Sequence, residues 1–352
     1  MGEIKFMKGN EALAEAAIRA GLQGYFGYPI TPQSEVVEYL AMEEPKHKYV
    51  LIQAESEVAA VNMVYGGAAA GARVMTTTSS PGFSLMQEGV SYIACAELPC
   101  VFANVVRGGP GLGTIQASQG DYFQAVKGGG HGDYHLIVFA PNSVQEMVDF
   151  CILGFELADK YRTPVMLLSD GATGQMMEKV VLPEPIEYKP DKPWATTGKA
   201  KDRERNIITS LYIQSEEMEA KNNILQAKYK EITENEIRYE AYNLDDADVV
   251  ITAFGLMSRV CKKTVDLARD EGIKMGLIRP ITVWPFPTGT IAELADREEL
   301  KFFISVEMNA GQMVEDVRLA VNGKKPVHFY GRQGGIIPTP DEVLAAAKEY
   351  LK

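Results

Sequence analysis

Short apolar runs alternate with helix-like segments through the first half of the chain. The runs predicted as strands are residues 24–28, 49–52, 73–77, 100–106, 136–139 and 164–168. The segments between them are rich in small residues or amphipathic, as in the small-residue helix predicted over 58–70. Six strands that alternate with helices up to residue 170 predict a doubly wound α/β domain.

The pattern changes near residue 182, which indicates the end of this domain. Residues 182–192 are rich in proline and charge, a composition that is typical of a domain exit. Residues 214–240 carry many Glu, Lys and Asn side chains and few large apolar ones. Charge runs of this kind are usually solvated, so we expect an exposed helix within a linker.

A second α/β unit begins at Asp245. Its predicted strands are residues 249–253, 275–278, 302–307 and 327–330, with a helix over 258–271. We therefore predict three parts: a first domain over 1–190, a linker with an exposed helix over 191–244, and a second domain over 245–352.

Two acids lie on either side of a serine where the strand at 49–52 ends. Ser56 is a favourable helix N-cap, and Glu57 then falls in the first helical turn, where an acid suits the helix dipole. This local role would account for almost any single Glu at such a position. It does not account for the order that follows: a small-residue helix, a strand, Ser-Ser-Pro-Gly at 79–82, another helix and a Leu-Pro pair before the next strand.

Arg107 directly follows the predicted buried strand over 100–106, and a glycine-rich loop follows it over 108–113. The loop is not a Walker A phosphate site, because no Gly-Lys-Ser/Thr follows. It also lacks the third glycine of a dinucleotide fingerprint, since position 114 is Thr. A lone arginine is usually solvated or ion-paired. However, ligands of open parallel sheets bind at the carboxyl ends of the strands, so Arg107 is a candidate binding residue.

Two further polar residues each have two interpretations. Thr31 precedes Pro32, so it is a candidate N-cap with the proline as the first helical residue; a helix N-terminus at this point also favours an anion. His131 lies in the glycine-rich stretch 127–133. Both a contact with cofactor or substrate and a purely structural role stay open for it.

Charge and cysteine content exclude several classes of protein. The net charge of −12 argues against nucleic-acid binding, which requires a basic face. No apolar run reaches the ~18 residues of a membrane span, and residues 1–9 do not form a signal peptide, so a soluble cytoplasmic protein is expected. The four cysteines are scattered without a C-x-x-C pair. We therefore expect neither an iron–sulfur cluster nor a disulfide on this chain, and buried structural cysteines instead.

The order of elements around Glu57 resembles the pyrimidine-binding domain of thiamine diphosphate enzymes. The resemblance implies that Glu57 hydrogen-bonds the cofactor's aminopyrimidine ring and holds it in the imino tautomer, so that its exocyclic nitrogen can act as a base. Ser80 and Gly82, in the Ser-Ser-Pro-Gly turn, are then expected at the same cofactor. Glu55 matches a variable position of the family.

A wider resemblance covers essentially all 352 residues. The run Tyr-Pro-Ile-Thr-Pro at 28–32, then Arg107, then Arg-Pro-Ile-Thr-Val-Trp-Pro-Phe-Pro at 279–287 are similar to the alpha subunit of 2-oxoacid:ferredoxin oxidoreductases, most of all the 2-oxoisovalerate (3-methyl-2-oxobutanoate) type. It implies that Thr31 lies near the carboxylate and carbonyl of the substrate and that Arg107 binds that carboxylate. The second domain resembles the transketolase C-terminal domain, so Arg279 and Glu307 are expected to be structural.

The resemblance also implies how cofactors are shared between subunits. Ser169-Asp170-Gly171 is similar to the start of a diphosphate-and-Mg²⁺ motif, but the Asn-Asn pair that would complete it occurs only at 222–223, far too distant. A beta subunit is therefore expected to carry the diphosphate site, Mg²⁺ and an iron–sulfur cluster. Small gamma and ferredoxin-like delta subunits would complete the complex.

The implied reaction is oxidative decarboxylation of a branched-chain 2-oxoacid with coenzyme A, which gives an acyl-CoA, carbon dioxide and reduced ferredoxin. Two alternatives stay open: an alpha subunit specific for 2-oxoglutarate or pyruvate, and a non-catalytic assembly subunit that kept the fold. The presence of Glu57 counts against the second.

Overall fold

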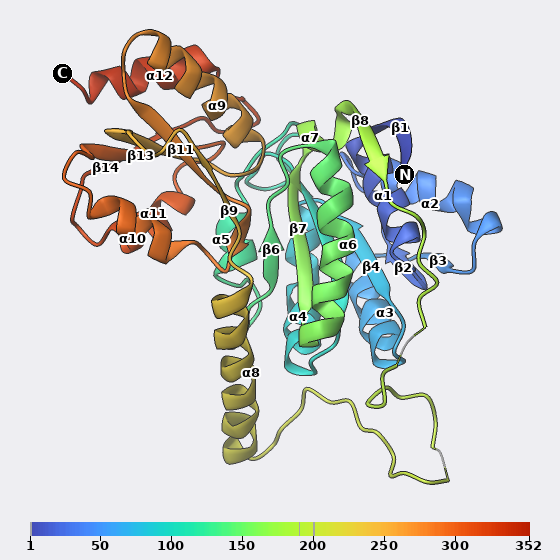
Figure 1. The fold of residues 1–352 in the computed structure, drawn as a ribbon. Coiled ribbons are helices and arrows are strands. Elements are labelled where there is room, and N and C mark those ends of the chain that lie inside the picture. The colour runs from blue at the N-terminus through green and yellow to red at the C-terminus, as the bar shows by residue number, and fades with distance from the viewer. Residues whose placement is uncertain (1, 190, 200) are drawn as a thin grey trace.

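The computed structural model describes residues 2–189, 191–199 and 201–352, and their strands form three sheets (Figure 1). The largest has seven strands in the order β12-β6-β7-β5-β4-β2-β3. These strands are β2 (Gly24–Gly27), β3 (Val50–Gln53), β4 (Val74–Thr78), β5 (Cys100–Val106), β6 (Ile137–Phe139), β7 (Pro164–Asp170) and β12 (Thr282–Trp284). All neighbours run parallel except β12 and β6. The six strands predicted before residue 170 are confirmed, and the α/β class with them.

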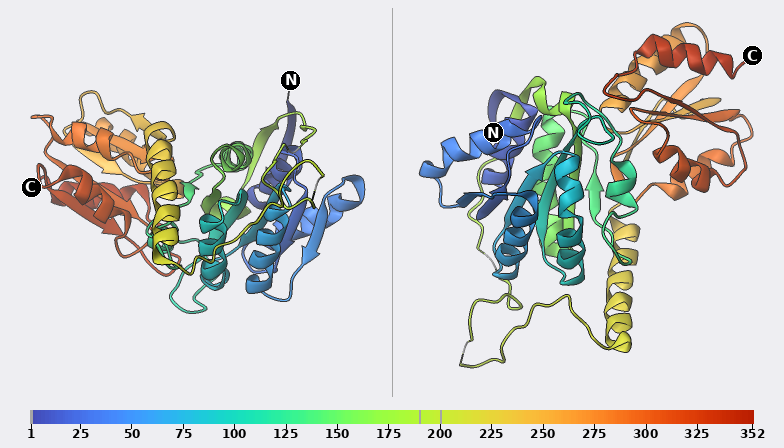
Figure 2. Two further views of the ribbon diagram at one scale, coloured as in Figure 1. Left: turned by 90° about the horizontal axis from the view of Figure 1, so that it is seen from below. Right: turned by 180° about the vertical axis from the view of Figure 1, so that it is seen from behind.

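Helices cover both faces of this sheet (Figure 1, Figure 2). The helices on one face are α1 (Gly9–Arg19), α2 (Ser34–Glu43) and α6 (Val144–Tyr161), and those on the other are α3 (Glu57–Ala69) and α4 (Pro81–Cys95). Strand side chains alternate between faces, so Val74 packs with α3 and α4, whereas Met75 packs with α1 and α6. By the same alternation, Thr76 and Thr78 face α3 and α4, and Thr77 faces the opposite side.

The second large sheet has five strands in the order β14-β13-β10-β11-β9. They are β9 (Tyr239–Tyr242), β10 (Val249–Thr252), β11 (Met275–Pro280), β13 (Phe302–Glu307) and β14 (Val327–Gly331). Helices α9 (Gly255–Asp270) and α12 (Pro340–Glu349) cover one face, and α10 (Thr288–Ala295) and α11 (Met313–Val321) cover the other (Figure 1). The strands and helix predicted from residue 245 onward are therefore confirmed.

Within the two large sheets, two short strands lie where the sequence predicts none. Strand β9 lies within 191–244, the stretch expected as a linker, and pairs antiparallel with β11 of the second sheet. Strand β12 follows β11 in the chain but pairs with β6 of the first sheet. Strands of four and three residues are too short to show a clear periodicity of their own, so their pairing depends on tertiary contacts.

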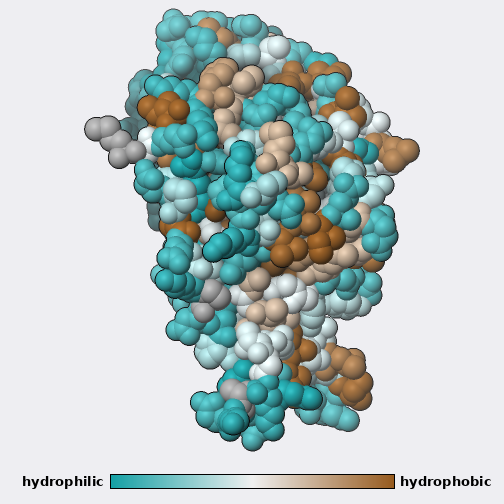
Figure 3. All heavy atoms as spheres, turned by 90° about the vertical axis from the view of Figure 1, so that its right-hand side faces the viewer, coloured by the Kyte–Doolittle hydropathy of each residue, from teal (hydrophilic) through white to brown (hydrophobic). Residues whose placement is uncertain are grey.

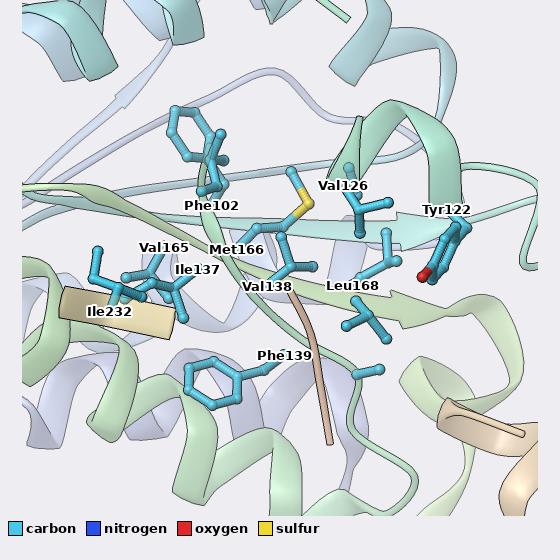
Figure 4. Packing of buried hydrophobic residues seen from close by; sticks show 14 of the residues in the cluster. Phe102, Tyr122, Val126, Ile137, Val138, Phe139, Val165, Met166, Leu168 and Ile232 are labelled. Carbon is cyan, nitrogen blue, oxygen red and sulfur yellow. The ribbon is translucent and has the colours of Figure 1, made fainter. Parts of the chain in front are cut away.

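Helix α8 (Ser215–Asn235) is the exposed helix expected within 214–240. Its buried residues are Leu225, Tyr229 and Ile232, and most of its length projects beyond both sheets (Figure 1, Figure 2). Figure 4 shows how it is attached: Ile232 lies in one group of buried side chains with Ile137 of β6 and Val165 of β7. About two turns of the helix, from Leu225 to Ile232, thus anchor it to the core.

Hydrogen bonds around Gln119 join the two large sheets. Its side-chain Nε2 donates to the Phe254 carbonyl at 2.8 Å, and its Oε1 accepts from the Met308 backbone amide at 3.0 Å. The Asn309 side chain donates to the Gln119 carbonyl at 2.8 Å. Because Gln119 is itself buried, these bonds fix the loop after β5 against the end of β13.

A small third sheet pairs β1 (Glu3–Lys8) with β8 (Met177–Leu182) antiparallel. Its residues Ile4 and Phe6 are 57% and 67% exposed. On the side of the molecule shown in Figure 3, hydrophobic residues form several separate patches between hydrophilic ones. Within the described residues, no helix combines the length and the apolar character that a bilayer crossing requires.

Candidate functional site

Apart from His131, the candidate site residues from the sequence cluster at one end of the seven-stranded sheet. This is the carboxyl end of its parallel strands, where α7 (Gly171–Gln175) follows β7 (Figure 1). Thr31 follows β2, Glu57 follows β3, Ser80 and Gly82 follow β4, and Arg107 follows β5. Side chains from four separate loops meet there because the carboxyl ends of parallel strands share one edge.

Glu57 is the first residue of α3 and is 6% exposed. The Ser56 hydroxyl accepts a 3.2 Å hydrogen bond from the Ala59 amide, so the predicted N-cap is confirmed. The Glu57 carboxylate makes no hydrogen bond with any other described residue. Glu55 is exposed, so the two acids around the serine differ in environment as well as in position.

Gly82 gives the Glu57 carboxylate its space. A Cβ added to Gly82 would overlap the hydroxyl oxygen of Thr78 and lie 2.5 Å from Glu57 Oε1. Any larger residue would therefore push against both side chains. Thr78 is 1% exposed. Its buried hydroxyl has no hydrogen-bond partner in the described part of the chain. The sequence analysis did not select Thr78, because a threonine at the end of a strand carries no distinctive signal.

Ser80 connects the turn after β4 to the loops around it. Its φ of 23° is unusual for a residue with a Cβ and costs conformational energy. Three bonds hold it there. Its amide donates to Asn104 Oδ1 at 2.9 Å, its hydroxyl donates to Asp121 Oδ2 at 2.7 Å, and the same hydroxyl accepts from the Arg107 amide at 3.1 Å.

Asp121 is a site residue that sequence reasoning missed. Its Oδ2 also accepts a 2.9 Å bond from the Asn104 side chain. Burial raises the pKa of the Asp121 carboxyl, and the bonds from Ser80 and Asn104 only partly oppose that shift in pKa. Ser80 and Asp121 are 41 residues apart, so no local pattern links them.

Arg107 and Thr31 are brought together directly. Arg107 Nη1 donates to the Thr31 carbonyl at 2.9 Å, and Nη2 donates to the Leu112 carbonyl at 3.1 Å. The Nε atom is buried and has no partner among the residues described. Arg107 thus holds the loop after β2 to the loop after β5.

The prediction that Thr31 is a helix N-cap is wrong. Helix α2 begins at Ser34, and Gln33 occupies the N-cap position. The Pro32 carbonyl accepts bonds from the side chains of Asn10 and Gln175 at 2.8 and 3.1 Å. Because tertiary contacts use this carbonyl, the helix starts later, and Thr31 stays in an exposed loop.

His131 lies away from this cluster. It is exposed, and its ring is edge-on to Tyr92, with 6.4 Å between the ring centroids. Together with Cys95 and Leu225 it lines a cavity of about 240 Å³ between α4 and α8. Glu57, by contrast, lies beside the first turn of α4. The structure does not bring His131 to the other candidate residues.

Asp170, in the motif that resembles a diphosphate site, acts as a helix cap. Its Oδ1 accepts from the amides of Ala172 and Thr173 at 2.9 and 3.0 Å, and its Oδ2 accepts from the Thr173 hydroxyl at 2.9 Å. Burial raises the pKa of its carboxyl. Glu307, expected to be structural, similarly accepts bonds from the amides of Met313 and Val314 at the start of α11. In the described ranges, no group of three His, Cys, Asp or Glu residues is arranged to hold a metal ion.

Two successive parts of the chain each match a known protein family. Residues 15–245 match the family described as pyruvate flavodoxin/ferredoxin oxidoreductase, thiamine diphosphate-binding. Residues 247–343 match the family described as pyruvate:ferredoxin oxidoreductase core domain II.

Two relatives match along almost their whole length. A ketoisovalerate oxidoreductase subunit VorB from Methanothermobacter thermautotrophicus is 51% identical over 98% of this chain and 97% of its own. A 2-oxoglutarate synthase subunit KorA from Methanothermobacter marburgensis is 37% identical over 98% of each chain.

A solved structure of 2-oxoglutarate:ferredoxin oxidoreductase from Magnetococcus marinus, with 2-oxoglutarate, coenzyme A and succinyl-CoA bound, matches with a TM-score of 0.89 at 28% identity. The match covers all of this chain and 66% of that one. This chain therefore spans about two thirds of that protein's length.

Proposed function

This chain belongs to the 2-oxoacid:ferredoxin oxidoreductase family, and we propose that it is the subunit that binds the thiamine ring and the 2-oxoacid in a heteromeric enzyme. The reaction is oxidative decarboxylation of a branched-chain 2-oxoacid with coenzyme A, which gives an acyl-CoA and carbon dioxide and passes electrons to ferredoxin. The observation that carries the proposal is the Arg107–Thr31 contact at the same strand ends as the buried Glu57 carboxylate.

Arg107 has the chemistry to bind the carboxylate that every 2-oxoacid carries. A guanidinium has five N–H donors, and two of them already reach the carbonyls of Thr31 and Leu112. The Nε side is buried, so a substrate carboxylate would meet the hydrogens that remain on Nη1 and Nη2. The Thr31 side chain, held beside them, is then in reach of the same substrate.

The surroundings of Glu57 suit the aminopyrimidine ring of thiamine diphosphate. The buried Glu57 carboxylate has no hydrogen-bond partner among the described residues, and a buried hydroxyl without a partner, that of Thr78, lies beside it next to Gly82. When bound, the cofactor supplies the nucleophilic carbon and the electron sink for decarboxylation. Glu57 would accept the hydrogen bond of the ring nitrogen and stabilise its protonated form. Ser80 sets the turn that places Gly82 beside the Glu57 carboxylate.

Partner subunits complete the enzyme in this proposal. A beta subunit would carry the diphosphate site, Mg²⁺ and an iron–sulfur cluster, and gamma and ferredoxin-like delta subunits would carry the rest. The engagement of Asp170 as a helix cap supports this division, since that carboxylate already has its hydrogen-bond partners. Val58 and Leu85, near the starts of α3 and α4, are 47% and 56% exposed and give a partner apolar surface near Glu57.

The charges near Arg107 favour a branched apolar substrate over 2-oxoglutarate. A second carboxylate at the far end of the substrate would cost several kcal/mol if it were buried unpaired. From 104 to 121 the only basic residue is Arg107. Lys127, the next candidate cation, forms an ion pair with Asp316 in the second domain. Leu112 and Ile115 of the intervening loop are 83% and 57% exposed and give an apolar tail something to pack against.

The test is a ferredoxin reductase assay of the purified complex with 3-methyl-2-oxobutanoate, pyruvate and 2-oxoglutarate. We expect the highest kcat/KM with the branched substrate. A tenfold preference for 2-oxoglutarate, about 1.4 kcal/mol in transition-state terms, would favour the 2-oxoglutarate-specific alternative instead, which the 37% identical relative represents. Inactivity with every 2-oxoacid would favour a non-catalytic assembly subunit.

A further inference from the structure

The Thr78 hydroxyl is an unexplained polar group beside Glu57 and Gly82. Thr78 is the last residue of β4, it is 1% exposed, and Oγ1 has no hydrogen-bond partner within the described residues. Buried hydroxyls almost always have a partner, because a buried hydroxyl without one loses the hydrogen bonds that it makes to water in the unfolded chain. A missing partner next to the residue proposed to bind the thiamine ring indicates that the hydroxyl is used when the cofactor is bound.

The neighbour of this hydroxyl is Glu57. Both Thr78 Oγ1 and Glu57 Oε1 lie so close to the Cα of Gly82 that a Cβ there would collide with each. No hydrogen bond joins the two side chains in the described structure. Two buried groups of complementary type, one donor and one acceptor, therefore lie side by side with their bonding capacity unused.

We propose that Thr78 is a positioning residue for Glu57. This inference rests on the proposed function, in which Glu57 accepts a hydrogen bond from the thiamine ring. A carboxylate has two oxygens, and the ring nitrogen uses one of them. The Thr78 hydroxyl donates to the other, which fixes the plane of the carboxylate and favours its ionised form. Thr78 acts on the cofactor only through Glu57.

Strand β4 supplies its own matched control. Thr76 lies two residues earlier on the same face of the strand, is 0% exposed and also has a hydroxyl without a partner in the described chain. It is not among the three atoms nearest to a Cβ on Gly82. Thr→Val keeps the size and the β-branched shape that a strand favours and removes only the hydroxyl. Thr76→Val therefore removes a buried hydroxyl from the same face of the same strand, but not the hydroxyl beside Gly82 and Glu57.

The experiment measures binding on the assembled complex by calorimetry, with Mg²⁺ present, for wild type, Thr78→Val, Thr78→Ser and Thr76→Val. Two ligands are compared: thiamine diphosphate, and an analogue in which the ring nitrogen that faces Glu57 is replaced by carbon. We expect Thr78→Val to bind thiamine diphosphate about 10-fold more weakly, as the loss of a hydrogen bond to a charged group predicts. We expect it to bind the analogue as wild type does. Thr78→Ser and Thr76→Val should bind both ligands normally.

Two results would overturn the inference: normal thiamine diphosphate binding by Thr78→Val, or equal weakening for both ligands, since a general packing defect does not depend on the ring nitrogen. If Thr78→Val does not assemble, Thr78→Ala compared with Thr78→Ser asks the same question. Glu57→Gln in the same assay separates the inference from its premise. If Glu57→Gln distinguishes the ligands and Thr78→Val does not, only the positioning role fails. If Glu57→Gln binds both ligands as wild type does, the proposed role of Glu57 fails.

Discussion

Arg107 Nη1 donates a 2.9 Å hydrogen bond to the backbone carbonyl of Thr31, which lies 76 residues earlier in the chain. The same guanidinium reaches the Leu112 carbonyl through Nη2. One side chain thus organises the loops that follow β2 and β5. The positive charge of the guanidinium attracts an anion, whereas its planar arrangement of N–H donors holds the two loops together. The charge and the planar shape therefore make separate contributions to the site.

Arg107→Lys should separate these two contributions. Lysine keeps the positive charge but lacks the planar fork, so the Thr31 and Leu112 carbonyls lose at least one of their donors. We expect kcat/KM for the 2-oxoacid to fall about 10- to 100-fold, the usual range for a lost hydrogen bond involving a charged group. Steady-state kinetics of the complex measures this. The KM for coenzyme A serves as an internal control and should not change. If kcat/KM stays within twofold of wild type, the planar guanidinium is dispensable.

Glu57→Gln should abolish most turnover while the fold survives. Glutamine keeps the shape and one hydrogen bond but cannot stabilise a protonated ring nitrogen. The expected loss in kcat is about 10²- to 10⁴-fold, as for a positioned acid–base group. Glu55→Gln is the matched control, since Glu55 lies two residues earlier in an exposed position and should lose little. Similar losses in both variants would refute the assignment of Glu57.

Asp316→Ala should destabilise the contact between the two domains. Asp316 Oδ2 accepts a 2.7 Å bond from the buried Tyr122 hydroxyl, and Oδ1 pairs with Lys127. Removal of the carboxylate leaves a buried hydroxyl unsatisfied, so we expect the free energy of unfolding to fall by about 1–3 kcal/mol. Urea denaturation measures it. Glu315→Ala is the control, because both acids lie in the first turn of α11 and only Glu315 is exposed. Equal effects would mean that the loss comes from the helix dipole and not from the Tyr122 contact.

Asp121 should make stability depend on pH. Burial raises the pKa of its carboxyl in the folded chain, whereas the pKa of an aspartate in an unfolded chain is about 3.9. As pH rises, the unfolded chain loses this proton first. The stabilisation is therefore complete below the unfolded pKa and is lost as pH rises from there through the folded pKa.

Asp121→Asn removes this dependence. We measure the Tm of wild type and variant from about pH 4 to pH 7. The Tm of the variant should increase relative to that of wild type as pH rises. Asp133→Asn, at an exposed position, should follow wild type throughout. A constant difference between wild type and Asp121→Asn over this range would mean that the Asp121 carboxyl does not titrate differently in the two states.

The sequence alone determined most of the elements of this fold and their class, but not the strands β1, β8, β9 and β12. The strands before residue 170 are short apolar runs with helices between them, so their local pattern identifies them. The Ser56 cap and the position of Glu57 at the first helical turn also depend on residues within one turn. The exposed helix α8 follows from local composition. Each of these features arises from interactions between residues close in the chain, and such interactions leave a periodic or short-range pattern.

The tertiary structure alone decided how the site is assembled. Thr31 was predicted to cap a helix, but bonds from Asn10 and Gln175 to Pro32 delay the start of α2. His131 was a candidate, and it lies elsewhere. Asp121 and Thr78 were not selected, and they lie beside Ser80 and Glu57. These arrangements depend on hydrogen bonds and close contacts between loops that are tens of residues apart. Such contacts form only when the carboxyl ends of the parallel strands meet at one edge, which no local sequence pattern records.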